Sequence, residues 1–518
     1  MAGCGIIQWN CGGIKNKRGE LQVLADVAKN ACFCIQETKL HANDDFVIRG
    51  YKSYLYGVEL EEGQNAHGGV GVLVRDGLSQ YIVPLNTSFQ AVAVSVKFHK
   101  RVTVCSIYLP PNEPHFELDR LEDLLHQLPQ PFVLLGDFNA HNSLWGSEKT
   151  CRKGKVLERF IARNNICLLD SKEPTHISRA HGTFSHVDLS LCSSSLMNDF
   201  HWGVNDDSMD SDHFPIMLQI KEKFIAGSRE RWVLQKADWA AFHQIDWDRD
   251  DWGALDSMES RADFVTSSIV RAAEKTIPRS SGNGSGKCAV WFNEECKAAK
   301  KERSRAAKAL RDKNKTITDK TNRSIENMKE RVELKRAQAK ARRTFKRVRA
   351  QSWKEFLGGI SCENTTMEVW RRVNLLNRTY RPSIISTLKL GDELVDDRKR
   401  IADAIAERFS DVSSLNSCSE DFKRYKRDNE VDLDFSTNVM LEYNLPFTMW
   451  EMDSAIDSAK DSSPGPDKIH YRMIKNLNSQ NRIILLQFFN DLYKSGEIPS
   501  GWKMAYVIPL LKKGKDPL

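Results

Sequence analysis

An apolar run that stops abruptly at a glycine, with alternating polar residues after it, constrains the fold of this chain most strongly. Phe132-Val-Leu-Leu is typical of a buried strand, Gly136 ends it, and Asp137, Asn139 and His141 follow. Successive side chains of a strand point to opposite faces, so these three would share one face if extension continues. Open α/β folds carry their chemistry at such strand ends. An ordinary Asx-rich turn is the alternative, because Gly, Asp and Asn are common turn residues.

Further short strands, separated by turns and helical stripes, are expected throughout residues 5–220. Eight stretches are β-branched or alternate in polarity, and they begin at Gly5, Phe33, Gly69, Ala91, Val102, Phe132, Ile166 and Val187. Helical spacing relates two apolar sets, which are Leu118, Leu121, Leu125 and Leu128, and Val156, Leu157, Phe160 and Ile161. Strands interleaved with helices predict a layered α/β fold.

Length and composition limit the class of protein. A chain of 518 residues predicts two to four domains at roughly 150 residues per domain. No apolar run approaches the ~18 residues of a membrane span, and the N-terminus lacks the design of a signal peptide. We therefore expect a protein of the nucleus and cytoplasm that binds no membrane. The 12 cysteines are scattered without a Cys-x-x-Cys pair, so a zinc finger is not expected.

Polar side chains of a few kinds follow several of the predicted strands. The set is Asn10, Glu37, Tyr108, Asp137, Asn139, Thr183, Asp188, Ser211, Asp212 and His213. Carboxylate and amide oxygens hold Mg²⁺, which bridges to phosphate oxygens. A carboxylate with an imidazole orients and deprotonates water, and an amide donor can meet charge developing on phosphorus. The pattern therefore predicts hydrolysis of a phosphodiester with a hard divalent cation.

Six short motifs in this set resemble the exonuclease-endonuclease-phosphatase family. In chain order they are Gln8-Trp-Asn10, Ile35-Gln-Glu37-Thr, Ser106-Ile-Tyr108, Gly136-Asp137-Phe-Asn139, Val187-Asp188 and Ser211-Asp212-His213. Their order and spacing match the family over residues 5–220. The resemblance implies a four-layer α/β/β/α sandwich with its site in a cleft between the loops of the two sheets.

The resemblance also implies catalytic roles at matching positions. Tyr108 would contact the scissile phosphate, Asp137 would orient the nucleophilic water, and Asn139 would stabilise the pentacovalent phosphorus. His213 with Asp188 would form a pair that acts at the same phosphate.

Metal and substrate roles follow from the same resemblance. Glu37 would be the principal ligand of Mg²⁺, with Mn²⁺ as a possible substitute, and Asn10 a second ligand. Asp212 would be a further metal contact. Thr183 and Ser211 would bind substrate.

Simpler structural explanations exist for single positions. Asn10 could cap the turn before Gly12, Tyr108 could be a core aromatic residue, and His213 could be a buried histidine bonded to backbone. His141 and His186 match no family position, so we expect them in turns or at the surface.

The positive charge of the chain is concentrated in one segment. The net charge is +7, but residues 287–350 contain 22 Lys and Arg against 8 Asp and Glu, which leaves −7 for the rest. The segment has few helix breakers, which predicts long helices. They could simply have a solvated face, but next to a phosphodiesterase a polyanion partner is favoured. The candidate nucleic-acid contacts are Lys300, Lys301, Arg303, Arg342, Arg343, Lys346 and Arg347.

A second resemblance begins at Thr448. An amphipathic helix leads into a Pro464-Gly-Pro-Asp turn, and Trp502-Lys503 leads toward Pro509-Leu-Leu-Lys-Lys. This resembles the opening of the reverse-transcriptase domain of non-LTR (LINE-like) retrotransposons, whose fingers begin with such a turn and strand. A polymerase palm needs paired aspartates for two metals. The Asp-Asp pairs at 206–207 and 396–397 precede the segment that resembles the fingers, and we expect them in a loop and at a helix start. This chain alone should therefore not synthesise DNA.

The sequence therefore predicts three parts. They are an endonuclease domain at 1–222, a helical linker at 223–447 with a Gly/Ser-rich flexible joint at 280–286, and a truncated start of a reverse-transcriptase domain at 448–518. The predicted function is a Mg²⁺-dependent endonuclease that nicks double-stranded target DNA and leaves a 3′-hydroxyl primer for target-primed reverse transcription. Element RNA would be a partner in a full-length product. The alternatives are an abasic-site repair nuclease or phosphatase of the same fold, and an inactive nucleic-acid-binding remnant.

Overall fold

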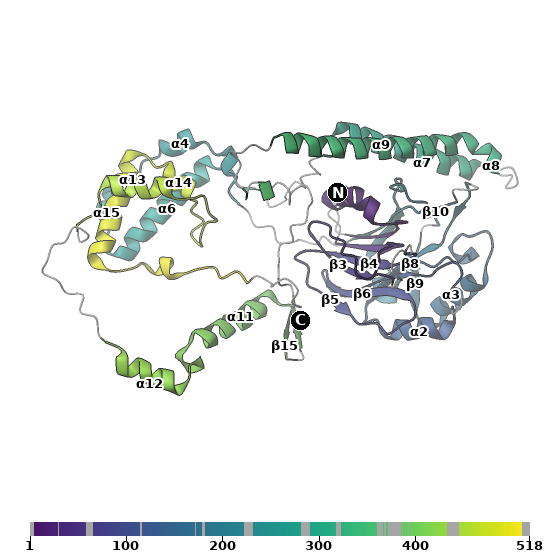
Figure 1. The fold of residues 1–518 in the computed structure, drawn as a ribbon, viewed down its shortest axis with the longest axis horizontal. Coiled ribbons are helices and arrows are strands. Elements are labelled where there is room, and N and C mark those ends of the chain that lie inside the picture. Colours follow the sequence, from purple (N-terminus) through teal and green to yellow (C-terminus); the bar gives the residue numbers. More distant parts are fainter. Residues whose placement is uncertain are drawn as a thin grey trace. The chain divides into compact units, whose positions relative to one another are not determined.

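The chain divides into two compact units in a computed structural model (Figure 1). The first unit comprises Met1–Ile225, Gly286–Ile405 and Leu510–Leu518, and the second Ala226–Ser285 and Ala406–Pro509. The structure describes residues 5–28, 31–58, 66–113, 116–170, 172–178, 182–221, 231–280, 291–317, 323–359, 393–431 and 445–509, with a few positions between 366 and 391. Three predicted features lie outside these residues. They are the flexible joint beyond residue 280, the 222/223 boundary and the segment that contains Lys512-Lys513. The two boundaries between the three predicted domains stay predictions.

Two six-stranded mixed sheets form the centre of the first unit. The first sheet has the order β13-β14-β1-β2-β4-β3 and contains β1 (Gly5–Asn10), β2 (Cys32–Gln36), β3 (Tyr51–Tyr56), β4 (Val70–Arg75), β13 (Phe200–Val204) and β14 (Ile216–Ile220). The second has the order β5-β6-β7-β8-β12-β9 and contains β5 (Gln80–Val83), β6 (Gln90–Lys97), β7 (Arg101–Tyr108), β8 (Phe132–Asp137), β9 (Ile166–Leu169) and β12 (Asp188–Ser193). Within these sheets β1 pairs with β2, and β7 with β8, in parallel, and the remaining neighbours are antiparallel.

Alternating side chains of the strands divide the core into layers. In β8, Val133 and Leu135 belong to the core between the sheets, whereas Phe132 and Leu134 pack toward α2 (Leu118–His126) and α3 (Arg152–Arg163). In β1, Ile6 faces the other sheet and Ile7 packs with α1 (Arg18–Ala28). The predicted four-layer α/β/β/α sandwich is therefore confirmed.

All eight predicted strands of this sandwich are present, together with four sheet strands that were not predicted. Three of the additional strands, β3, β5 and β13, lie at sheet edges. Each has at least one exposed position among buried ones, so its apolar pattern is weak. A two-residue hairpin, β10 (His176–Ile177) and β11 (Phe184–Ser185), was also too short to detect by periodicity.

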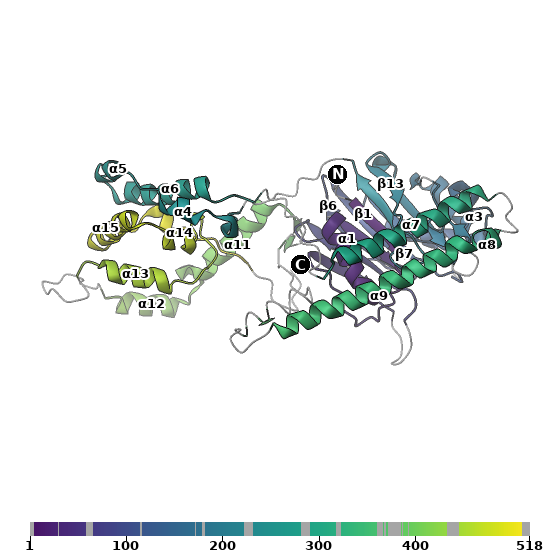
Figure 2. The same ribbon diagram turned by 90° about the horizontal axis from the view of Figure 1, so that it is seen from above.

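The basic segment forms the long helices that its composition predicts. Helix α7 (Glu294–Thr316) and helix α9 (Met328–Gly358), joined through α8 (Arg323–Glu326), make an antiparallel hairpin (Figure 2). Small side chains let the helices approach, and Cys296 and Ala299 of α7 pack with Ala341, Phe345 and Val348 of α9. The hairpin lies beside α1 within the first unit.

The second unit is helical in its described residues. It contains α4 (Trp239–His243), α5 (Arg249–Gly253), α6 (Met258–Thr276), α12 (Glu420–Asn429), α13 (Met449–Ser458), α14 (Tyr471–Lys475) and α15 (Ser479–Ser495), and α11 (Arg398–Ser413) begins in the first unit. The core joins distant segments, because Trp252 of α5 packs edge-on against Phe488 of α15. None of the described helices is long and apolar enough to cross a bilayer.

The segment that resembles a reverse transcriptase folds in part as expected. Thr448 caps α13. A turn forms one residue later than predicted, over residues 465–468, where Lys468 N donates to Gly465 O at 3.1 Å. Residues 504–509, the described part of the strand expected after Trp502, have no regular structure. Ile508 is 74% exposed, and the described part of this unit has no strand with which it could pair. The aspartate pairs are in a loop and at the cap of α11, where Arg400 N donates to Asp397, as predicted.

Candidate active site

Strand pairing brings the predicted site residues to one edge of the sandwich. Asn10 ends β1 and Glu37 follows β2, and these strands are parallel neighbours. Tyr108 ends β7 directly beside Asp137, which ends the parallel strand β8. Because β12 runs antiparallel to β8, its first residue, Asp188, lies beside Asp137. The register of the sheets therefore gathers five side chains that are far apart in the sequence.

His213 reaches the same edge from the loop between β13 and β14. Its backbone forms an isolated bridge with His176, and Phe214 N donates to Thr175 O at 2.7 Å. The Trp9 indole donates to the carbonyl of His213 at 3.2 Å. These contacts fix the loop on both sides of the imidazole.

The backbone is strained at two of the site residues. Glu37 has φ 49° and Asn139 has φ 46°, a left-handed conformation that costs roughly 1–3 kcal/mol at non-glycine residues. Gly136 is required next to Asp137, because a Cβ there would lie 2.1 Å from Ile107 O. The motif Gly136-Asp137-Phe-Asn139 is therefore a tight strand exit that aims polar groups at the site.

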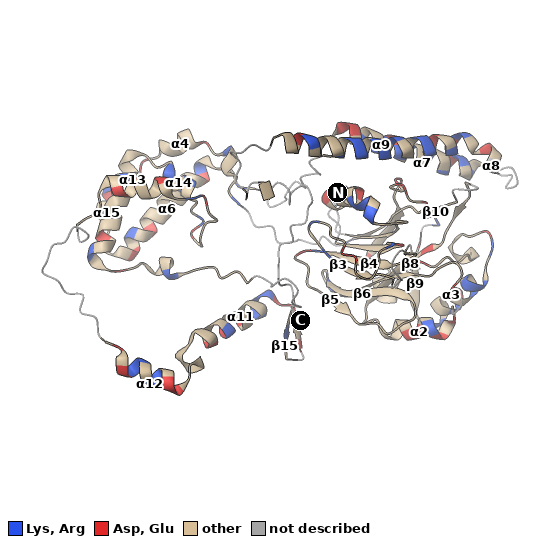
Figure 3. Ribbon diagram, viewed as in Figure 1, with Lys and Arg blue, Asp and Glu red and all other residues tan. Residues whose placement is uncertain are grey.

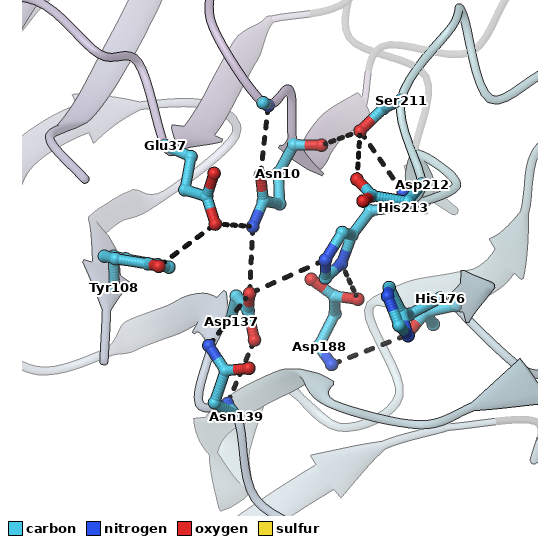
Figure 4. Close-up of polar contacts among 12 residues, drawn as sticks. Asn10, Glu37, Tyr108, Asp137, Asn139, His176, Asp188, Ser211, Asp212 and His213 are labelled. Atoms are coloured by element: carbon cyan, nitrogen blue, oxygen red, sulfur yellow. Dashed lines mark hydrogen bonds and ion pairs between the residues drawn. The ribbon is translucent and has the colours of Figure 1, made fainter. Parts of the chain in front are cut away.

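A hydrogen-bonded network connects the carboxylates of the site (Figure 4). Asn10 Nδ2 donates to Asp137 Oδ2 at 2.9 Å and to Glu37 Oε1 at 3.2 Å. The Tyr108 hydroxyl donates to Glu37 Oε1 at 3.0 Å. Asn139 donates to Asp137 through its backbone N at 2.9 Å and its amide at 3.3 Å. The network holds Glu37 and Asp137 on opposite sides of one amide.

His213 and Asp188 form the expected pair, on the other side of Asp137. His213 Nδ1 lies 2.8 Å from Asp188 Oδ2, and Nε2 lies 3.8 Å from Asp137 Oδ2. Burial alone would lower the pKa of His213, but the charges of Asp188 and Asp137 raise it to about 10. The imidazole is therefore protonated at neutral pH, and Asp188 orients it.

Burial sets the proton affinity of the two other reactive groups. Burial raises the pKa of Asp137 to about 7, against the opposing charge of His213. Burial and the nearby carboxylates of Glu37 and Asp137 raise the pKa of Tyr108 well above its ordinary range, so its hydroxyl stays a donor. Asp137 can thus accept a proton near neutral pH.

The raised pKa of His213 predicts a loss of stability at high pH. The stabilisation is fully present below the unfolded pKa of about 6.5 and is lost as pH rises through about 10. Above pH 8 Asp137 is already ionised and changes little. In EDTA, the free energy of unfolding should fall by ~2–3 kcal/mol more between pH 8 and 10 in the wild type than in His213→Gln. Urea titrations at fixed pH values measure this, and equal pH slopes would contradict it.

Two neighbouring donor sets could hold a divalent cation. Ligand atoms of Asp137, Asp188 and His213 lie within 4.8 Å of one another, and all three residues are buried. His213 is protonated and bonded to Asp188, which disfavours it as a ligand. The Glu37 side chain is 24% exposed and offers oxygen, which a hard cation prefers. The Glu37 side therefore fits Mg²⁺ better.

Asn10 presents its amide nitrogen to the carboxylates in this structure. Its Oδ1 accepts from Gly12 N at 3.1 Å, while Nδ2 lies between Glu37 and Asp137. Asn10 would bind a cation through oxygen only after its amide turns over. Its predicted role as a ligand stays a prediction.

The other predicted metal and substrate contacts, Asp212, Ser211 and Thr183, differ in burial and contacts. Asp212 is half-buried beside His213 and helps to raise the pKa of His213. Ser211 is 1% exposed and its hydroxyl donates to Asn10 O at 2.9 Å, so a positioning role is favoured over the predicted substrate contact. Thr183 is exposed and lines a groove beside the site.

His176 is a site residue that the sequence reasoning missed. Its ring centroid lies 4.6 Å from that of His213, and its Nδ1 lies 2.8 Å from Ser185 Oγ. Burial and the charge of His213 lower the pKa of His176 to about 4, so it is neutral. A lone histidine between Thr175 and Ile177 has no spacing that would identify it.

Buried amides behind the site were also overlooked, although they belong to the quoted motifs. Gln8 Nε2 donates to Gly136 O at 3.0 Å, and Ser190 donates to Gln8 Oε1 at 2.7 Å. Gln36 Nε2 donates to Ser106 Oγ at 2.9 Å. These bonds join the two sheets directly beneath Asn10 and Asp137. Their signal was a polar residue inside an otherwise apolar strand.

Lys and Arg recur along α7 and α9 (Figure 3). The basic candidates among them divide into two groups by burial. The exposed or half-buried ones are Lys300, Lys301, Arg342, Arg343, Lys346 and Arg347. Arg303 is only 1% exposed, and its guanidinium pairs with Glu20 and Asp207 of the sandwich. The prediction that Arg303 contacts nucleic acid is therefore wrong, because burial and two carboxylates remove it from the surface.

Comparisons with known proteins identify relatives of this chain. Residues 102–217 match the family described as endonuclease-reverse transcriptase. The RNA-directed DNA polymerase from mobile element jockey of Drosophila melanogaster is 22% identical over 526 residues, which cover 98% of this chain and 54% of that protein. Its counterpart in Drosophila funebris is 27% identical over 173 residues, covering 33% of this chain and 18% of that protein. The chain thus spans about half the length of the first of these relatives.

A solved structure is similar to part of this chain. The endonuclease domain of TRAS1, a telomere-specific non-LTR retrotransposon, is 23% identical, with a TM-score of 0.36, and the match covers 42% of this chain and 99% of that one. The matched segment 102–217 contains Tyr108, Asp137, Asn139, Asp188 and His213. Residues 102–217 therefore match an endonuclease-reverse transcriptase domain, and nearly the whole chain is similar to about half of an RNA-directed DNA polymerase from a Drosophila mobile element.

Proposed function

We propose that this chain is a Mg²⁺-dependent endonuclease, with Mn²⁺ as a substitute, that nicks one strand of duplex DNA and leaves a 3′-hydroxyl end. One observation carries the proposal most directly. Asp137 is fully buried between the Asn10 amide and the His213 imidazolium, with Glu37 on the far side of Asn10. A base, a cation and a carboxylate able to hold a metal ion are the groups that hydrolysis of a phosphodiester requires.

Asp137 would act on the attacking water. As the water oxygen bonds to phosphorus, Asp137 accepts its proton, and the bond from phosphorus to the 3′ oxygen breaks. The products are a 5′-phosphate and a 3′-hydroxyl, whose oxygen takes a proton from solvent. The pKa of about 7 suits a base that works near neutral pH.

The remaining side chains would orient and stabilise. Protonated His213 can donate from Nε2 to a non-bridging phosphate oxygen, because Nδ1 is held by Asp188. Asn139 donates to Asp137 and to Leu109 O, which supports an orienting role beside its predicted contact with phosphorus. Tyr108 would contact the phosphate with a hydroxyl that stays protonated.

A metal ion belongs on the Glu37 side in this proposal. Mg²⁺ held by Glu37, with Asn10 and Asp212 as further contacts, would neutralise charge on the phosphate and the leaving oxygen. A 3′-hydroxyl end is what an RNA-directed DNA polymerase extends, so double-stranded target DNA and element RNA are the proposed partners of a full-length protein. In this reading residues 1–222 are the endonuclease, 223–447 a linker, and 448–518 the start of the polymerase.

A plasmid assay tests the function. Supercoiled plasmid should be converted to nicked circles with Mg²⁺ or Mn²⁺ and should stay supercoiled in EDTA. A DNA polymerase should extend the nicks without phosphatase treatment, because the ends carry a 3′-hydroxyl. Nicking that persists in EDTA, or ends that need a phosphatase before extension, would contradict the proposal.

Substrate comparison separates this function from the alternatives of the same fold. Intact duplex, duplex with an abasic site, and inositol phosphates should be offered at equal concentration. Cleavage of intact duplex at a rate comparable to abasic duplex supports the proposal. Cleavage confined to abasic DNA would indicate a repair nuclease, phosphate release alone a phosphatase, and binding without cleavage a remnant.

A further inference from the structure

A groove beside the candidate active site has no role in the reaction proposed above. Its volume is about 540 Å³, within the range of roughly 300–1,000 Å³ typical of ligand sites. His141, the loop residues 146–149, Lys172, Pro174 and residues 183–186 form part of its lining. The last turns of α7, with Arg311, Asn314 and Lys315, supply the rest. The groove therefore combines the sandwich with a helix that follows it by some seventy residues in the sequence.

A short chain of contacts connects this groove to the reacting groups. Ser185 lines the groove and is hydrogen-bonded to His176 Nδ1 at 2.8 Å. The ring of His176 lies against that of His213, with centroids 4.6 Å apart. A polymer whose phosphate lay at His213 would have its next units in or beside the groove.

Positive charge gathers along the groove. Lys149, Lys172 and Lys315 line it and are exposed, and within the described part of the chain no carboxylate forms an ion pair with any of them. Among the described lining residues, Glu148 is the one that has a carboxylate. Arg311 differs, because its side chain is 7% exposed and pairs with Asp206 at 3.1 Å. Three exposed lysines therefore line a space that an anion can enter.

The wall from α7 is held in place by the site loop itself. The Arg311 guanidinium lies 4.7 Å from the ring centroid of Phe214, the residue after His213. Phe214 also packs with Ala307 and Leu310 of α7. The position of Lys315, one helical turn beyond Arg311, is thus coupled to the loop that positions the imidazolium.

We propose that this groove binds the sugar-phosphate backbone of duplex DNA next to the scissile linkage, and that helix α7 supplies one wall of the substrate site. The inference rests on the proposed function for its choice of DNA. Lysines attract phosphates as point charges and hold a strand in register without reading bases. The nuclease would then need α7 for full affinity, although the catalytic groups all belong to the sandwich.

Binding experiments on the full chain test the groove. The probe is a labelled DNA duplex, and Asp137→Asn is used as background so that the probe is not cut. Lys149→Gln, Lys172→Gln and Lys315→Gln should each reduce the slope of log affinity against log salt by about 0.9, and the triple variant by about 2–3. In the active protein, the triple variant should raise KM about tenfold or more at unchanged kcat.

The matched control is Lys97→Gln. Lys97 is exposed at the end of β6 that pairs with Arg101, whereas the other end of this strand pairs with Tyr108 at the site. The Lys97→Gln substitution removes the same charge at the opposite end of the strand. Its slope of log affinity against log salt should therefore equal that of the Asp137→Asn parent. If Lys315→Gln behaves like Lys97→Gln, α7 is no part of the substrate site and the proposal fails.

Two further outcomes separate the groove from the function. A wild type that nicks no DNA would remove the proposed function, while reduced salt slopes in the lysine variants would still support a polyanion groove. Lysine variants that weaken binding of single-stranded RNA but not of duplex DNA would overturn the assignment to DNA.

Discussion

Replacing Asp137 by asparagine should lower the rate of plasmid nicking by about 10²–10⁴-fold. The amide keeps the shape of the side chain and an oxygen that can accept from Asn139 N, but it cannot take a proton from water. Binding of duplex DNA should stay the same or become tighter, because a negative charge is removed from a site that faces phosphate. Single-turnover nicking in Mg²⁺ and equilibrium binding in EDTA measure the two effects separately.

The control for this variant is Asp123→Asn. Asp123 is an exposed aspartate on α2, away from the strand ends that form the site. It should nick at the wild-type rate, which shows that loss of one carboxylate is not enough to reduce activity. If Asp137→Asn nicks supercoiled plasmid at the wild-type rate in Mg²⁺, Asp137 is not the base and the proposed mechanism is wrong.

Replacing Arg303 by methionine should destabilise the first unit by about 3–5 kcal/mol. Burial alone would lower the pKa of Arg303, but Glu20 and Asp207 raise it, so the guanidinium is always charged. Its Nε lies 2.8 Å from Asp207 Oδ1, and the Asp207 side chain is 3% exposed. Methionine fills part of the space but leaves buried carboxylate without a partner. Chemical unfolding measures the loss, and faster amide exchange in α7 would locate it.

Removing all three charges provides a sharp comparison. The triple variant Arg303→Met, Glu20→Gln, Asp207→Asn should recover most of the stability that Arg303→Met loses, because no uncompensated charge remains buried. Lys301→Met, an exposed neighbour on the same helix, should change stability by less than about 0.5 kcal/mol. A change of that small size for Arg303→Met would show that α7 does not pack on the sandwich through this pair.

Local pattern determined much of the architecture. The eight predicted strands and the helices α2, α3, α7 and α9 formed because strand and helix periodicities place apolar side chains on one face, and that signal is contained in a few neighbouring residues. The strand-end motifs could be found for the same reason. Each motif joins an apolar strand to one polar residue, as in Gly136-Asp137-Phe-Asn139.

Edge and pairing requirements were less predictable. β3, β5 and β13 have one neighbour only and weak apolar patterns, so periodicity missed them. The strand expected after Trp502 has the right composition but no partner among the described residues of its unit. A strand forms only when another segment accepts its hydrogen bonds, and that segment can be anywhere in the chain.

The amino-acid sequence by itself determined which side chains stand at the strand ends, and therefore which chemistry the site can perform. Only the tertiary structure decided that Asp137 is fully buried beside a protonated His213, that His176 packs on that imidazole, and that Arg303 is an internal ion pair and no surface cation. The reason is physical. Burial, pKa and ion pairing depend on groups brought together by folding from distant parts of the chain, and no local pattern contains them.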